Sequence, residues 1–535
     1  MPRQQQMLFH GMNELRSDYN AARSSRFRRT RGGIPYQGAD ADWHLTQTAM
    51  LRMMETFRDF DRNDPIFGQG VTRLIDNVCP GKINLDPNTG DTQVDQHLTK
   101  LWDDWASNPN NVDSAREHDW NIKTNQALRQ VIIDGDTFGI RRSTGHLQTL
   151  EAHRCREATR ARKSKSNIGI RRNASTGEKI AFDLTRVDMG TRGSIKISDV
   201  NTSRRIGPDG IQQVFQVYNP KRSSMGRGVG AAAPVVDIIG MRDDLDFAKL
   251  VQAQVVSSYS IVEKLPDNPD LLGALAALIK SEGDGEEFGF DAKSLALGDD
   301  SIDTVKLQPG RILRPRIPGA TYETLKADVP NAEYFQFGTL LLTYLSVNLG
   351  IPLMVLLLDP SNSNFSAWRG AMQQARMGFA SVQDWMVNSW HAPIYRWKVA
   401  EWLATDVFLQ EWVAGGDDRS IDIYRHGWNP KGYEYIEPVK DTTAHLMQLS
   451  NGMTSGRRFA QRVHGCTWEQ LVTEIINDRK LAIEAAIDGA DELNSSHPDL
   501  PESVHWRDLM PTPTAKGISI SFGDEPAPQS QGDAS

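Results

Sequence analysis

A stretch of 25 residues without a charged side chain, 334–358, limits more than any other feature what this chain can fold into. A helix of that length would be long enough to span a bilayer. However, Gly350 and Pro352 would break the helix in its middle, and Gln336 and Asn348 would need hydrogen-bond partners in lipid. No basic flank marks a cytoplasmic side. The sequence therefore argues against membrane insertion, and a membrane pore stays an alternative that detergent-free solubility would eliminate.

The favoured interpretation divides this stretch into parts with different physical roles. We expect a helix over 333–349 that is buried between neighbouring subunits or domains. A break at 350–352 and an apolar run to Leu358 follow, because Gly and Pro interrupt helices. The residues of 359–364 are Asp, Pro, Ser and Asn, each of which favours turn geometry. The pattern predicts a buried helix that leads into a short polar loop.

The remainder of the first half indicates a mixed α+β body. Apolar residues at helical spacing predict helices over 42–78. Residues 119–240 contain strand-like runs, VIIDGDTFGIRR and QQVFQVYN. A long helix with one apolar seam is expected over 238–262, followed by an irregular segment, 266–330.

The second half carries further start and stop signals for helices. Ser, Thr and capping-box patterns mark starts, while Gly and Pro mark ends. We expect three short terminal helices and disordered ends at 1–41 and 496–535. In chain order the signals are a helix from Ser366 to about Trp402 interrupted at Pro393, a helical region beyond Pro438 that stops at Gly452, a cap at Thr454 and a capping box at 467–470.

Charge and cysteine content exclude several classes of protein. The net charge of −8 argues against a protein that grips nucleic acid tightly, because phosphate contacts need Lys or Arg. The arginine-rich stretch 23–31 is better explained as a solvated tail than as a nucleic-acid contact. For the eight basic residues of 154–172, an exposed loop and a phosphate-facing patch explain the pattern equally well. Cys79, Cys155 and Cys466 are too scattered for a disulfide framework, which predicts synthesis in a reducing cytoplasm.

No catalytic motif stands out. The chain lacks GxxxxGK[ST], HExxH and GxSxG, so an ATP-driven motor, a zinc hydrolase and a serine hydrolase have no support. The glycines of 226–230 are spaced wrongly for a dinucleotide site and predict a turn before a helix. We expect no catalytic residue, metal or cofactor, and a structural or interaction role. The enzymatic alternative is a metal-dependent nuclease built on the carboxylates of Asp59, Asp61, Asp134 and Asp136. A helix end explains Asp59 and Asp61 more simply, and an Asp-Gly hairpin turn explains Asp134 and Asp136.

Motifs shared with one protein family follow one another along nearly the whole chain. They are RNDP in 51–78, GDTF in VIIDGDTF, LQTLEAHRCREA, RGVG before the long helix, LQPGRI, GIP followed by NFS and PIYRW in 335–397, and EPVKD with GMT in 427–472. This order resembles the lambda-like branch of bacteriophage portal proteins. The chain departs from the family pattern at Asp136, where Glu is common, at Glu437, where Asp is usual, and in the longer basic loop 154–172.

The resemblance implies a mainly helical α+β portal fold with wing, stem, clip and crown regions. Such proteins are made in the host cytoplasm and assemble as a ring, typically dodecameric, at one capsid vertex of the virion, without a membrane. Double-stranded DNA passes through the ring during packaging and ejection. The implied partners are the terminase large subunit, head-completion or adaptor proteins, and the major capsid protein with its scaffold. The implied regions are a wing (42–236), stem helices (237–264 and 331–349), a clip (265–330), a tunnel loop (350–365), a kinked helix with wing return (366–438) and a crown (439–495).

The resemblance also implies roles for particular residues. A short polar loop without Lys or Arg can face DNA without anchoring its phosphates. The implied tunnel-loop residues are Leu357, Asp359, Ser361, Asn362, Ser363 and Asn364. The implied stem-packing residues between subunits are Met241, Leu245, Ala248, Val255, Leu341 and Leu345. The implied clip docking surface consists of Glu282, Asp284, Glu286 and Glu287.

Overall fold

The computed structural model describes residues 40–158, 167–186, 196–257, 261–264, 321–324, 332–359, 361, 364–415, 422–433, 438–497 and 503–509. The described residues form two compact units: a small unit within Ala232–Leu349, and a large unit within Gln37–Ala231 and Gly350–Ser535. The expected arm 1–41 lies outside the described residues, except for its last two positions. Most of the expected clip, 265–330, including its four acidic docking residues, also lies outside.

The large unit begins with helices that are capped by polar side chains, as the sequence predicts. Thr46, Asp64, Asp91 and Asp119 each accept a hydrogen bond from a backbone N–H of the following first turn. Asp64 and Pro65 separate the first two helices, which confirms the helix end expected there. The helices are α2 (Gln47–Asn63), α3 (Pro65–Val78), α4 (Thr92–Ala106), α5 (Pro109–Val112) and α6 (Trp120–Asp134), after the short 3-10 helix Ala41–His44.

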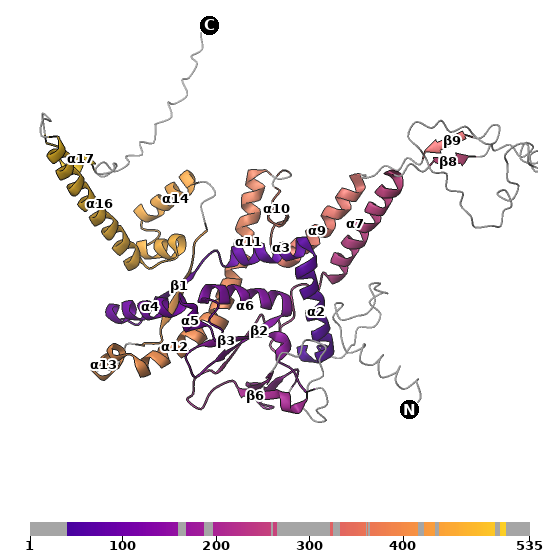
Figure 1. The fold of residues 1–535 in the computed structure, drawn as a ribbon, viewed down its shortest axis with the longest axis horizontal. Coiled ribbons are helices and arrows are strands. Elements are labelled where there is room, and N and C mark those ends of the chain that lie inside the picture. Colours follow the sequence, from indigo (N-terminus) through magenta and orange to yellow (C-terminus); the bar gives the residue numbers. More distant parts are fainter. Residues whose placement is uncertain are drawn as a thin grey trace, which may run out of the picture. The chain divides into compact units, whose positions relative to one another are not determined.

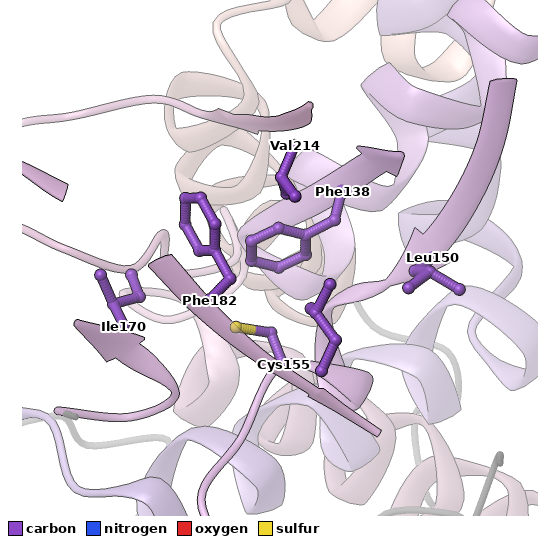
Figure 2. Packing of buried hydrophobic residues seen from close by; sticks show 7 residues of the cluster. Phe138, Leu150, Cys155, Ile170, Phe182 and Val214 are labelled. Atoms are coloured by element: carbon purple, nitrogen blue, oxygen red, sulfur yellow. The ribbon is translucent and has the colours of Figure 1, made fainter. Parts of the chain in front are cut away.

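Two three-stranded antiparallel sheets follow, with strand orders β3-β2-β7 and β4-β5-β6. Phe138 and Phe182, one from each sheet, meet edge to face with ring centroids 5.6 Å apart, and Figure 2 shows them next to each other. The two sheets therefore share one apolar core, to which Leu150, Cys155 and Val214 also belong. The strands are β2 (Asp136–Arg141), β3 (Leu147–Glu151), β4 (Ile170–Arg172), β5 (Lys179–Thr185), β6 (Val200–Arg204) and β7 (Val214–Tyr218), with 3-10 helices at Ala152–Arg154 and Ile197–Asp199.

The expected hairpin turn at Asp134-Gly135-Asp136 is wrong. Asp134 is the last residue of α6, Gly135 ends the helix with φ +98°, and Asp136 begins β2. A Cβ on Gly135 would lie 2.4 Å from the carbonyl carbon of Gly228, so only glycine fits this close approach. The apolar run VII that suggests a strand is the last turn of the buried helix α6.

The second half of the large unit packs against its first half through aromatic side chains. Trp120 of α6 stacks on Trp390 with centroids 5.6 Å apart, and Trp102 of α4 packs against Tyr395 and Trp428. β10 (His426–Pro430) pairs antiparallel with β1 (Ile83–Pro87). The helices of this part are α10 (Leu353–Leu357), α11 (Phe365–Met386), α12 (Ala392–Thr405) and α13 (Val407–Gly415).

The interruption expected at Pro393 takes the form of a π-helical turn, Val387–His391, between α11 and α12. Proline has no N–H and crowds the preceding turn, and a widened turn relieves that crowding. The cap expected at Ser366 is wrong by two residues: the Asn364 side chain accepts a hydrogen bond of 2.7 Å from the Ala367 N–H.

The terminal helices differ in part from the expectation. Gly452 stops α14 (Pro438–Ser450) with φ +67°, and the Thr467–Gln470 capping box begins α16 (Trp468–Ser496), as predicted. Ser455, not Thr454, caps α15 (Gly456–Phe459), which continues as the π-helical turn Ala460–His464. Of the three terminal helices expected, α16 is long rather than short, at 29 residues. Within the tail expected to be disordered, Trp506–Leu509 forms the short helix α17.

The small unit is a pair of helices joined to a pair of strands. α7 (Val236–Ser257) leads into β8 (Ile261–Lys264), which pairs antiparallel with β9 (Thr321–Thr324), and α9 (Ala332–Leu349) follows. α7 and α9 pack side by side (Figure 1). The expected helix over 238–262 is therefore too long, because its end, with Val262, belongs to a strand.

Candidate functional site

The apolar run after Pro352 is anchored to the large unit. It forms α10 rather than a loop, and α10 packs on α3. Leu356 is buried, and the Arg73 guanidinium donates a hydrogen bond of 3.1 Å to the Val355 carbonyl oxygen. The loop that follows α10 therefore starts from a fixed point.

The polar loop begins with a strained residue. Leu358 has φ +54° and ψ +33°, a left-handed conformation that costs a non-glycine residue about 1 kcal/mol. Its side chain is 69% exposed. Strain of this kind persists where the surroundings impose it, and it is common at functional sites.

Local hydrogen bonds shape the loop. The Ser361 N–H and hydroxyl donate to the Asp359 carboxylate at 2.9 and 2.5 Å, and these two bonds lower the pKa of Asp359. The loop ends at the cap formed by Asn364. Leu357, Asp359, Ser361 and Asn364 are all exposed, whereas Asn362 and Ser363 lie outside the described residues.

The charge of this segment is small and negative. Asp359 is the one charged residue from 353 to 368, and the next, Arg369, pairs with Asp441 at 2.7 Å. No cation in 353–368 is therefore present to hold a phosphate. The arrangement offers hydrogen-bonding groups and one negative charge on a short loop between two helices.

The expected stem residues separate into two groups. Leu341 and Leu345 are buried within the chain itself, where α9 packs on α7. Met241 and Ala248 are exposed and Leu245 is half-buried, while the side chain of Val255 lies outside the described part. Beside this packing, the Tyr334 hydroxyl donates a hydrogen bond of 2.7 Å to Asp246, which raises the pKa of Tyr334.

Sequence reasoning missed an exposed apolar stripe on α9, formed by Phe337, Leu340, Tyr344 and Val347. Their spacing of three, four and three places them on one face of the helix. Val347 is 75% exposed. On α7, Phe247, Leu250 and Val251 are exposed as well. The signal was present in the sequence, because the stripe has helical spacing, but 334–358 is so apolar that its two faces could not be told apart.

The ends of the basic segment 154–172 are part of the fold. Arg171 pairs with Asp183 at 2.9 Å and Arg172 with Asp42 at 3.4 Å. Arg154 donates to the carbonyl oxygen of Thr185 at 2.7 Å. Residues 159–166, with four of the basic side chains, lie outside the described residues.

The carboxylates of the nuclease alternative do not form a metal site. Asp61 pairs with Arg129, Asp134 with Arg58 and Asp136 with Arg227, while Asp59 accepts a hydrogen bond from Asn63. Across the described ranges, no three His, Cys, Asp or Glu side chains gather as metal ligands would. None of the helices described is long and apolar enough to cross a membrane.

Comparison with known protein families gives a match over more than half of the chain. The matching family is "Phage portal protein, lambda family", over residues 27–383. This chain belongs to that family. As a portal protein it is a structural, non-enzymatic component of the phage virion, located at a capsid vertex, and its family implies assembly as a ring.

Solved structures give remote likenesses to this portal protein. A chain from the virion of a native gene transfer agent particle is 9% identical, with TM-score 0.35, covering 69% of this chain and 91% of that one. A chain from the neck of an empty gene transfer agent particle with C6 symmetry is 11% identical, with TM-score 0.35 and coverages of 68% and 92%. A chain from the native neck with C12 symmetry is 11% identical, with TM-score 0.34 and the same coverages. No curated protein matches this chain.

Proposed function

We propose that this portal protein forms a closed, typically dodecameric ring through which double-stranded genomic DNA is packaged and ejected. The terminase large subunit docks on it during packaging, and head-completion or adaptor proteins dock afterwards. The major capsid protein and scaffold surround it. The observation that carries this proposal is the exposed apolar stripe of α9. Family membership implies a ring, and the stripe is an apolar surface that a neighbouring copy could cover in that ring.

The physical argument for the stripe is its composition. Phe337, Leu340, Tyr344 and Val347 stand on a helix that has no charged residue after Glu333. Contiguous exposed apolar surface on a soluble protein marks an interaction site. A neighbouring copy of this chain is the occupant that a ring requires, and heterologous contacts between identical copies close into a ring when the rotation permits.

Within the ring we assign the segment 357–364, which is the end of α10 and the polar loop after it, to the DNA channel as its tunnel loop. Its anchored start at α10, the exposed Asp359 and Ser361, and the lack of cations in 353–368 support this assignment. DNA must slide past the loop, so weak hydrogen-bonding contacts suit the role better than phosphate clamps do. We further assign α7 and α9 to the stem, β8 and β9 to the clip, α14–α16 to the crown, and most of the large unit to the wing.

A pair of matched substitutions tests the stripe. Val347→Asp places a charge on the stripe, and Val439→Asp places one on an equally exposed valine of α14, 80% exposed compared with 75%. Sedimentation and electron microscopy should show rings for the wild type and for Val439→Asp, and smaller species for Val347→Asp. Unchanged rings with Val347→Asp would remove the stripe from the interface.

The channel assignment needs a different test. Residues 359–363 are replaced by a glycine-serine segment of equal length, so that Asn364 remains to cap α11. The control is the same replacement at 173–177, an exposed turn between β4 and β5. Particles with the first replacement should assemble but package or retain less DNA, and the control should behave as the wild type. Normal packaging with the first replacement would overturn the tunnel-loop assignment.

A further inference from the structure

A pocket of about 310 Å³ opens in the proposed crown between α14 and the α15 segment, by which we mean α15 with the π-helical turn that follows it. We call it the arginine pocket. Two arginines line it, Arg458 and Arg462, which lie one helical turn apart and therefore project to the same side. The remaining wall consists of His445, Gln448, Met453, Thr454, Phe459 and Val463.

The wall of this arginine pocket is held in place from several sides. Ser455 caps the helix by accepting a hydrogen bond from the Arg458 N–H at 3.3 Å. The Gln461 side chain donates to Asp86 at 3.0 Å, and the Asn84 side chain donates to the Gly465 carbonyl oxygen at 2.9 Å. Both partners belong to β1, so the turn that carries Arg462 is fixed to a sheet. The two guanidinium groups therefore project from a supported turn.

Aromatic rings border the pocket. Phe459 has its ring centroid 5.7 Å from that of His445 and 5.6 Å from that of His464, both edge to face. Such a border offers flat apolar surface beside the two cations. A deoxyribose of the DNA backbone can lie on that surface while its phosphate meets the arginines.

The charge of the segment that lines the pocket is one-sided. Residues 442–468 contain Arg457, Arg458 and Arg462 but no Asp or Glu, in a chain whose net charge is −8. Among the described residues, none of these three arginines has a carboxylate partner within ion-pair distance. All three are exposed, whereas the less exposed Arg58 and Arg227 each pair with an Asp. Within the described part of the chain, the two cations of the pocket thus have no carboxylate partner.

We infer that the arginine pocket binds phosphate groups of a nucleic-acid backbone, with duplex DNA as the ligand. The guanidinium fork matches a phosphate with two parallel hydrogen bonds, and neighbouring arginines favour a polyanion over an isolated carboxylate. The choice of DNA rests on the proposed function, since a portal ring is filled by DNA. Each copy in the ring contributes one pocket, so weak individual contacts add up around the DNA.

Fluorescence anisotropy with a labelled DNA duplex and the full-length protein tests the inference over a range of salt concentrations. The variant Arg458→Gln/Arg462→Gln removes both cations. The control Arg479→Gln/Lys480→Gln removes two exposed cations from α16 of the same region. We expect the affinity of the first variant for DNA to fall about tenfold or more. The slope of log binding constant against log salt concentration should become smaller in magnitude by about two. The control should stay near the wild type in both measurements. Equal losses in both variants, or no loss in the first, would overturn the inference.

Measurements on the unsubstituted protein guard against misfolding of the variant. A dicarbonyl reagent modifies exposed arginines, and DNA should protect Arg458 and Arg462 but not Arg479. Competition identifies the source of the anion: duplex DNA should displace the label, whereas polyglutamate at equal charge should not. Preferential displacement by polyglutamate would assign the pocket to an acidic protein instead. Ring formation is checked separately by electron microscopy, so rings without DNA protection overturn this inference alone, and missing rings overturn the proposed function.

Discussion

Arg227 donates two hydrogen bonds to the carboxylate of Asp136, at 2.5 and 2.9 Å, with both side chains buried. Its three other N–H groups bind the carbonyl oxygens of Ala152, Cys155 and Ile168 at 2.6 to 2.9 Å. All five donors of the guanidinium therefore have acceptors. The pair raises the pKa of Arg227 despite burial, because Asp136 stabilises its charge. This arginine ties the glycine-rich turn before α7 to the two sheets of the large unit.

Asp136→Asn should destabilise the fold strongly, because it leaves a buried guanidinium without its counter-charge. We expect the free energy of unfolding to fall by about 3–5 kcal/mol. The control is Asp209→Asn, since Asp209 pairs with Arg141 at the surface and its side chain is 44% exposed. That change should cost less than about 1 kcal/mol. Denaturant unfolding measures both, and similar losses would contradict the central role of Asp136.

Acid should weaken the fold through His391. Burial among aromatic rings lowers its pKa to about 4. The unfolded chain binds a proton there near pH 6.5, so between pH 6.5 and 4 the unfolded state binds more protons, and stability falls as pH falls through that window. The loss should reach about 3 kcal/mol. His391→Phe should flatten this part of the pH profile of unfolding, and an unchanged slope would show that other groups cause it.

Glycine should be preferred to alanine at Leu358. Because φ is +54° there, an alanine keeps the strain and a glycine releases it. Leu358→Gly should therefore be more stable than Leu358→Ala by about 1 kcal/mol, the reverse of the usual order. Thermal unfolding of the two variants decides this. An alanine variant that is as stable as the glycine variant would indicate that the loop relaxes.

Leu341→Asp should act on the chain itself. Leu341 is 5% exposed where α9 packs on α7, so the charge would be buried without a partner. We expect the free energy of unfolding to fall by about 3 kcal/mol or more. Val347→Asp should leave unfolding within about 0.5 kcal/mol of the wild type and should affect ring size alone. Circular dichroism during denaturation separates the two effects.

Local signals in the sequence predict much of the fold. Proline after Asp64, glycine at 452 and the capping box at Thr467 each act through neighbouring backbone groups, so their effects can be predicted without tertiary structure. The hairpin predicted at Asp134 failed for the opposite reason. Gly135 is required by its contact with Gly228, more than 90 positions away, and no local pattern reports such a contact.

In the candidate site too, some features follow from local sequence and others depend on tertiary contacts. The polar loop after Leu358 follows from its Asp, Ser and Asn residues, and among these Asp359, Ser361 and Asn364 are exposed. The split of α9 into a face packed inside the chain and an exposed stripe depends on where α7 lies. For the same reason Leu341 and Leu345, expected between subunits, pack within one chain instead. The arginine pocket requires α14 and the α15 segment to fold together, which the spacing of Arg458 and Arg462 does not reveal.

A cryo-electron microscopy reconstruction of the purified, full-length protein tests the central claim most directly. We predict a closed ring with an axial channel, in which Tyr344 and Val347 contact a neighbouring copy and Asp359 faces the channel. Persistent monomers, or a ring that leaves the α9 stripe in solvent, would contradict the account.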